Sequence, residues 1–196
     1  MSAIKREVKF WTPLRLVTTI IVLGLLVTFV LSSCNSNDPP SKTAARNLLP
    51  RQVLDAENRA ASGSAPIKLA NYSGKVLFVN LWATWCGPCR METPELVRLH
   101  KEFQSRGVEM VGLSTENPDA SARSVSEFVR EFNVDYQIGW AKPEVAQIMM
   151  QGRTSIPQSF IIARDGRVIR RFIGFNPDTT PTQLREALEQ ALKDEG

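Results

Sequence analysis

The chain has 196 residues, of which 43% are hydrophobic and 22% are charged, and its formal net charge is +4. This composition is typical of a globular protein and excludes a collagen, a coiled coil or a wholly disordered chain. Residues 1–33 hold a surplus of three positive charges, which leaves a surplus of one for the rest of the chain. Because phosphate binding needs a basic patch on the folded part, we expect no nucleic-acid partner.

Residues 1–33 have the layout of an export signal, since basic residues precede an uncharged and mostly apolar run over residues 16–31. The following Leu31-Ser32-Ser33-Cys34 resembles a bacterial lipobox, in which the Cys is lipidated and becomes the new N-terminus. The alternative is a retained transmembrane anchor, because the uncharged stretch continues to residue 37 and a bilayer span needs ~20 residues. Both interpretations place residues 35–196 outside the cytoplasm of a bacterium, tethered to its membrane.

Residues 34–65 are predicted to form a tether. Ser, Asn, Asp and Pro dominate residues 35–42 without apolar periodicity, which is typical of an extended or disordered segment. A short helix is predicted over residues 48–61, and Ser62-Gly63-Ser64 would end it.

Residues 66–196 are predicted to form one α/β domain in which strands and helices alternate. Apolar runs and helical spacing predict strands over 75–83, 108–114, 136–140, 158–164 and 167–173, and helices over 86–104, 120–132, 144–150 and 182–192. Pro94 lies inside the first helix, and Asp165-Gly166 is a hairpin signal between the last two strands. This order predicts a three-layer α/β domain.

The motif Trp85-Cys86-Gly87-Pro88-Cys89 joins the first strand to the first helix. Two Cys at this spacing can form a tight disulfide, and the positive end of the helix dipole favours the thiolate of the first Cys. An isolated C-x-x-C is otherwise half of a zinc site, but the chain has no second Cys pair, and its single His, His100, lies three turns beyond Cys89. We therefore expect no metal, and no cofactor besides the redox-active Cys86–Cys89 disulfide.

Residues 66–193 resemble the thioredoxin superfamily, because VNLWATWCGPC is close to a thioredoxin active-site signature. The chain is most similar to the TlpA-like branch of membrane-tethered, extracytoplasmic thiol–disulfide oxidoreductases, which includes reductants for cytochrome c maturation. The resemblance rests on the export segment, on Asn80 in place of the usual buried Asp, and on Glu92 three residues after the second Cys. Residues 116–143 resemble the helix-and-strand insertion of that branch. The resemblance implies a thioredoxin fold with a central mixed sheet.

The resemblance also implies a substrate site. Thr154-Ser155-Ile156-Pro157 resembles the cis-proline loop, in which the Ile156 backbone binds an extended substrate and the loop keeps metals off the cysteines. A trans Pro157 at the start of a strand is the alternative. Cys86 is expected to be the exposed nucleophile and Cys89 the more buried resolving cysteine. Trp85 is expected at the rim of the site.

Glu92 lies one helical turn beyond Cys89 and is predicted to be the base that deprotonates it, directly or through water. The alternative is a solvated glutamate that the helix dipole favours. Asn80 does not titrate, and we expect it to be a hydrogen-bonding strut. Arg170 and Arg171 are expected on an outward face of their strand.

The expected activity is reduction of protein disulfides. Gly-Pro between the cysteines matches thioredoxin, whose potential is about −270 mV, against about −120 mV for the oxidant DsbA. The implied partners are a disulfide-bearing protein substrate and a membrane electron donor. The alternatives are a thiol peroxidase of the same fold, which needs a peroxide-activating loop, and a non-catalytic binding module, which has no need of an intact motif. Peroxide-consumption and insulin-reduction assays separate these functions.

Overall fold

A six-stranded mixed sheet runs through residues 47–194, the part of the chain that the computed structural model describes. The predicted export signal and Cys34 lie outside these residues. The strand order is β1-β4-β3-β2-β5-β6, with β2, β3 and β4 parallel and the other pairs antiparallel. The strands are β1 (Arg59–Ala60), β2 (Val76–Trp82), β3 (Val108–Ser114), β4 (Gln137–Trp140), β5 (Gln158–Ile162) and β6 (Val168–Ile173).

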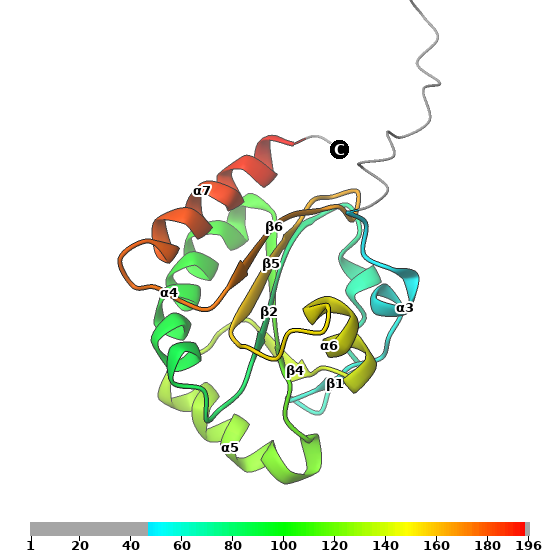
Figure 1. Cartoon of the computed structure of the whole chain (residues 1–196), viewed down its shortest axis with the longest axis vertical. Helices are drawn as coiled ribbons and strands as arrows, with labels where there is room; N and C mark the ends of the chain where they lie inside the picture. The colour runs from blue at the N-terminus through cyan, green and yellow to red at the C-terminus, as the bar shows by residue number, and fades with distance from the viewer. Residues whose placement is uncertain (1–46, 195–196) are drawn as a thin grey trace, which may run out of the picture. The chain divides into compact units, whose positions relative to one another are not determined.

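Helices cover both faces of the sheet and make three layers (Figure 1). The helices are α3 (Arg51–Leu54), η1 (Leu69–Tyr72), α4 (Gly87–Phe103), η2 (Gln104–Arg106), α5 (Pro118–Glu131), α6 (Pro143–Met150) and α7 (Thr180–Lys193). Buried residues of α3 and α6 form one core with the sheet, and those of α4 and α7 form another. Among residues 47–194, no helix combines the length and apolarity needed to cross a bilayer. The expected three-layer thioredoxin fold is confirmed.

The central strand β2 is buried along its whole length, as its continuous apolar run predicts. Side chains alternate between the two faces of a strand. Leu77, Val79 and Leu81 therefore join the core under α3 and α6, whereas Val76 and Phe78 join the core under α4 and α7. Asn80 lies on the same face of the strand as Val76 and Phe78. The alternation thus places a polar side chain directly beneath α4.

The remaining strands and helices agree with the sequence prediction within two residues at each end. The hairpin between β5 and β6 is also confirmed, and Gly166 in its turn has a φ of +86°. A positive φ costs glycine little because glycine lacks a Cβ atom. The register of β2 against β5 pairs Asn80 with Ser159, which brings two polar side chains to the same level of the sheet.

The predicted helix over residues 48–61 is wrong. Only α3 is helical there, and the chain then forms β1, which pairs antiparallel with β4 at the edge of the sheet. Asn58 is fully buried, and its side chain donates to the Ile67 carbonyl and accepts from the Lys142 N–H. These long-range contacts override the helical spacing. Leu49 and Val53 are buried too, so residues 47–65 belong to the domain and not to the predicted tether.

Candidate active site

Cys86 and Cys89 form a disulfide at the start of α4, with their Cα atoms 5.2 Å apart. Cys86 is the N-cap residue of this helix, and its Sγ accepts a hydrogen bond from the Cys89 N–H at 3.2 Å. The N–H groups of a first helical turn have no partner inside the helix, and they carry the positive end of its dipole. The motif therefore places the Cys86 sulfur where a thiolate is stabilised, as the sequence predicts.

The expectation that Cys86 is exposed is wrong for the disulfide form. Cys86 is 4% exposed and Cys89 is 1% exposed, so both sulfurs lie in a buried cluster. Ile156 packs against the same cluster and lies across from Cys86. The exposed member of the motif is Trp85, at 72%. Trp85 stands at the rim, as expected, beside the exposed Gly87 and Pro88.

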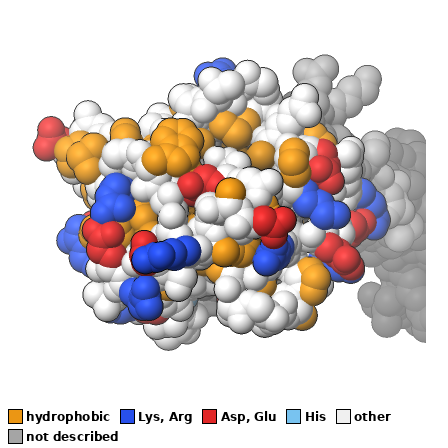
Figure 2. Space-filling model, turned by 90° about the horizontal axis from the view of Figure 1, so that it is seen from below, with side chains coloured by type: hydrophobic (Ala, Val, Ile, Leu, Met, Phe, Trp, Pro, Cys, Tyr) orange, Lys and Arg blue, Asp and Glu red, His pale blue; other side chains and the backbone are white. Residues whose placement is uncertain are grey.

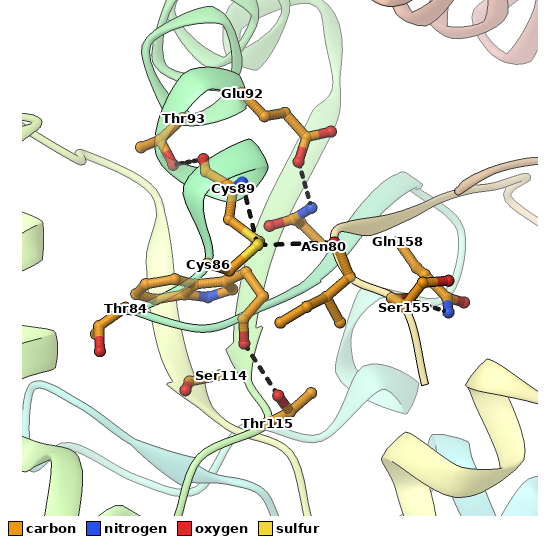
Figure 3. The surroundings of a disulfide bond; sticks show 12 residues. Asn80, Thr84, Cys86, Cys89, Glu92, Thr93, Ser114, Thr115, Ser155 and Gln158 are labelled. Carbon is orange, nitrogen blue, oxygen red and sulfur yellow. Dashed lines mark hydrogen bonds between the residues drawn. A yellow bond between two sulfur atoms is a disulfide. The ribbon is translucent and has the colours of Figure 1, made fainter. Parts of the chain in front are cut away.

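The Ile156–Pro157 peptide bond is cis, which confirms that prediction. The Ile156 carbonyl oxygen lies 3.7 Å from Cys86 Sγ, so the loop faces the disulfide (Figure 3). Gln158, which follows the loop, is fully buried, and its amide donates to the Ser155 carbonyl at 2.7 Å. Arg171, which lies on β6, donates a hydrogen bond to Gln158 Oε1 at 2.5 Å. Arg171 therefore does not lie on an outward face, because its guanidinium binds Gln158, whose amide in turn binds the cis-proline loop.

Glu92 is buried beneath α4, with 1% of its surface exposed. Its Oε2 accepts a hydrogen bond from Asn80 Nδ2 at 3.0 Å, and its Oε1 accepts one from Ser159 Oγ, also at 3.0 Å. Asn80 Nδ2 donates to Ser159 Oγ as well, at 2.9 Å. Figure 3 shows Glu92 reaching from α4 toward Asn80, with Cys89 on the same helix. The solvated alternative for Glu92 is wrong, and Asn80 is the expected hydrogen-bonding strut.

Burial raises the pKa of Glu92 from 4.5 to about 7, and the hydrogen bonds from Ser159 and Asn80 offset only part of this effect. Both donors are neutral, whereas a nearby cation would lower the pKa strongly. A carboxyl group with a pKa near neutrality accepts and releases protons efficiently at that pH. The arrangement is therefore suited to proton transfer one turn from Cys89.

Ser159 and Gln158 are site residues that the sequence analysis missed. They are the first two residues of β5, directly before its apolar residues, and polar residues at the start of a strand carry no signal of a role. Only the pairing of β5 with β2 brings Ser159 to Asn80 and Glu92. The β-strand period applied to both strands would have placed Ser159 on the same face as Ile161, under α4.

Comparison with known proteins agrees with this geometry. Residues 40–188 match the redoxin family. The chain belongs to this family. A relative from Bacillus thuringiensis named thiol-disulfide oxidoreductase ResA is 32% identical over 127 residues, which cover 65% of this chain and 67% of the relative. A ResA from Geobacillus thermodenitrificans is 28% identical over 182 residues, which cover 91% of this chain and 95% of the relative.

A solved structure from Chlorobium tepidum, a thiol:disulfide interchange protein of the thioredoxin family, has a TM-score of 0.58 and 28% identity. It covers 70% of this chain, which covers 97% of it. Together with the disulfide, these matches place the redoxin-family chain in the ResA-like branch of the thioredoxin superfamily. The protein is therefore a thiol–disulfide oxidoreductase, and Cys86 and Cys89 form its redox-active pair.

Proposed function

We propose that this redoxin is a reductase of protein disulfides that works outside the cytoplasm of a bacterium, tethered to the membrane. The observation that carries the proposal is the Cys86–Cys89 pair at the N-terminus of α4 with the buried Glu92 one turn along. The helix N-terminus stabilises a thiolate at Cys86. Glu92, with a pKa of about 7, supplies a proton acceptor near neutral pH.

The reaction proceeds by two exchanges. The Cys86 thiolate attacks a substrate disulfide, which forms a mixed disulfide and releases one substrate thiolate. Glu92 takes the proton of Cys89, directly or through water, and the Cys89 thiolate then attacks Cys86 Sγ. The Cys86–Cys89 bond forms, and the second substrate thiolate leaves. A membrane electron donor returns the pair to the dithiol form.

The proposal of a polypeptide substrate is supported by a hollow of about 340 Å³, which is lined by Trp85 and Ile156 near the disulfide. Its lining residues are Trp85, Thr115, Gln147, Met150, Gly152, Arg153, Thr154 and Ile156. An extended segment in this hollow would run past the Ile156 backbone toward Cys86, and its apolar side chains would meet Trp85. The resemblance to reductants for cytochrome c maturation makes a cytochrome c precursor the first client to examine.

The membrane tether is proposed from the N-terminal sequence. Cys34 follows the apolar segment in a lipobox-like context and would carry the lipid. Metabolic labelling with a fatty acid is expected to mark the wild-type chain and not Cys34→Ala. Membrane-bound chains that remain unlabelled in both cases would instead indicate a transmembrane anchor.

Reduction of insulin disulfides tests the activity. The wild-type chain should reduce insulin in the presence of a thiol donor, and Cys86→Ser should abolish turnover. Cys89→Ser should accumulate mixed disulfides through Cys86, which identifies the client, and the double Cys86→Ser/Cys89→Ser variant is the matched control. Consumption of peroxide without reduction of insulin would overturn the proposal in favour of a peroxidase. The lack of both activities would indicate a binding module.

A further inference from the structure

The turn that precedes Cys86 is held by a carboxylate that lies far from it in the sequence. Glu116 follows β3, and its Oε2 accepts hydrogen bonds from the Thr84 N–H at 2.8 Å and from Ser114 Oγ at 3.0 Å. Its Oε1 accepts one from the Thr84 hydroxyl, also at 2.8 Å. Both carboxylate oxygens therefore hold Thr84, which lies two positions before Cys86.

Backbone contacts join the same two loops. The Thr115 N–H donates to the Trp82 carbonyl at 2.9 Å. The Thr115 hydroxyl donates to the same oxygen at 3.3 Å, and Figure 3 draws this bond of the Thr115 side chain. The Cys86 N–H donates to the Ala83 carbonyl at 3.2 Å, which closes the turn that carries Thr84. Within residues 47–194, Glu116 accepts both of the hydrogen bonds that Thr84 donates to a side chain. The loop after β3 thus fixes the position of the loop after β2.

We propose that Glu116 is a positioning residue for the second exchange of the reaction. In the mixed disulfide Cys86 is bonded to the substrate, and no covalent bond joins it to Cys89. The Cys89 thiolate must then attack Cys86 Sγ, so that the Cys86–Cys89 bond forms while the Cys86–substrate bond breaks. The cysteine pair is oxidised by two electrons, and the substrate disulfide is reduced to two thiols. During this step the first turn of α4 and the turn before it keep the two sulfurs within reach.

The effect of such positioning on rate is large, because a displacement of about 1 Å from the reactive geometry can slow a reaction by ~10²-fold. A looser loop should therefore slow the attack by Cys89. It should affect the first attack less, because there the free thiolate of Cys86 meets a mobile substrate. This inference rests on the roles that the proposed function gives to Cys86 and Cys89.

Four substitutions separate positioning from charge. Glu116→Gln keeps the length of the side chain and one acceptor oxygen for the Thr84 N–H, and its amide can donate to the Thr84 hydroxyl. Glu116→Asp keeps the charge but is one methylene shorter, so it does not reach. Glu116→Ala removes every contact, and Thr84→Val removes only the hydroxyl contact. Glu127→Ala, an exposed carboxylate on α5 that pairs with Arg123, is the matched control.

The test follows the reduced full-length chain as it reacts with a small aromatic disulfide, dithionitrobenzoate, whose thiolate product absorbs visible light. All chains carry Cys34→Ala, so that only Cys86 and Cys89 react. The first release of product reports attack by Cys86. The second release reports attack by Cys89 on the mixed disulfide. Circular dichroism at the same temperature confirms that each variant is folded.

We expect the second release to slow about tenfold in Glu116→Asp and Glu116→Ala, and about twofold to threefold in Thr84→Val. Glu116→Gln and the Glu127→Ala control should stay within about twofold of the parent chain. Equal second-phase rates in all variants would overturn the proposal. A slow Gln variant beside a normal Asp variant would also overturn it, in favour of an effect of charge. Insulin reduction by the parent chain is scored separately, so a failure of the reductase function remains distinguishable.

Discussion

Substitution of Glu92 by Gln tests whether a buried titrating carboxyl group drives the chemistry. Burial raises the Glu92 pKa from 4.5 to about 7. The folded protein therefore binds more protons than the unfolded chain between these pH values, and its free energy of unfolding falls as pH rises through this window. At 1.36 kcal/mol for each pKa unit, ionisation of Glu92 costs about 3 kcal/mol above pH 7. This cost is absent below pH 4.5.

Glu92→Gln removes the ionisation of this side chain, and with it this group's contribution to the dependence of the free energy of unfolding on pH. Gln can accept from Asn80 and donate to Ser159, but the Ser159 hydroxyl proton then loses its acceptor, at a cost of about 1 kcal/mol. The variant should therefore be less stable than the parent by about 1 kcal/mol at low pH. It should be more stable by about 2 kcal/mol above pH 7. Urea unfolding of the disulfide form across pH 4.5 to 8 measures this crossing.

Near neutral pH the same variant should reduce insulin more slowly than the parent, by about tenfold or more, because the proton acceptor is lost. The pH profile of its turnover should also be flatter. Glu95→Gln is the matched control, since Glu95 is a buried carboxyl group on the same helix and Glu92 remains in place. It should keep the parental dependence of stability and turnover on pH. Parallel stability curves for Glu92→Gln and the parent, with unchanged turnover, would refute the reasoning and leave proton transfer to water.

Ser159→Ala removes a hydrogen bond that lowers the pKa of Glu92, so this pKa should rise and the acid limb of the turnover profile should move to higher pH. Alkylation of the reduced chain near neutral pH should label Cys86 before Cys89, and peptide mass spectrometry would show the reverse order if the assigned roles are wrong. Gly139→Ala places a Cβ against the β1 backbone and should lower the free energy of unfolding by about 1–3 kcal/mol, whereas an unchanged value would show that β1 yields easily.

Most of the fold follows from local patterns in the sequence. The apolar run of β2 is long enough to identify a central strand, and Asp165-Gly166 marks the β5–β6 hairpin. The two-residue strand β1 could not be predicted, because Arg59 and Ala60 carry no strand periodicity and pair only with β4. Short edge strands depend on tertiary contacts, and here the buried Asn58 supplies them.

Part of the candidate site could likewise be predicted from local sequence, and part of it could not. The spacing of Cys86 and Cys89 identifies the redox pair, because two cysteines at a helix start are a local feature. The environment of Glu92 is not local, since its partner Ser159 lies 67 residues away along the chain. Helical spacing puts Glu92 near Cys89 but leaves its burial undecided. The burial of Cys86 was misjudged for the same reason, as the covering residue Ile156 comes from a distant loop.

Disulfide exchange requires both a proton transfer and two sulfurs held close together. Different elements of the fold support the group that accepts the proton and the turn that carries Cys86. Asn80 and Ser159 lie on paired strands and hold Glu92 at a fixed depth, where neutral donors leave its pKa near 7. Glu116 lies on a loop and holds the turn that carries Cys86. The proton acceptor is thus supported by the sheet, independently of the loop that holds the turn before Cys86. Loosening that loop should slow the exchange of sulfurs without changing the pH at which Glu92 titrates.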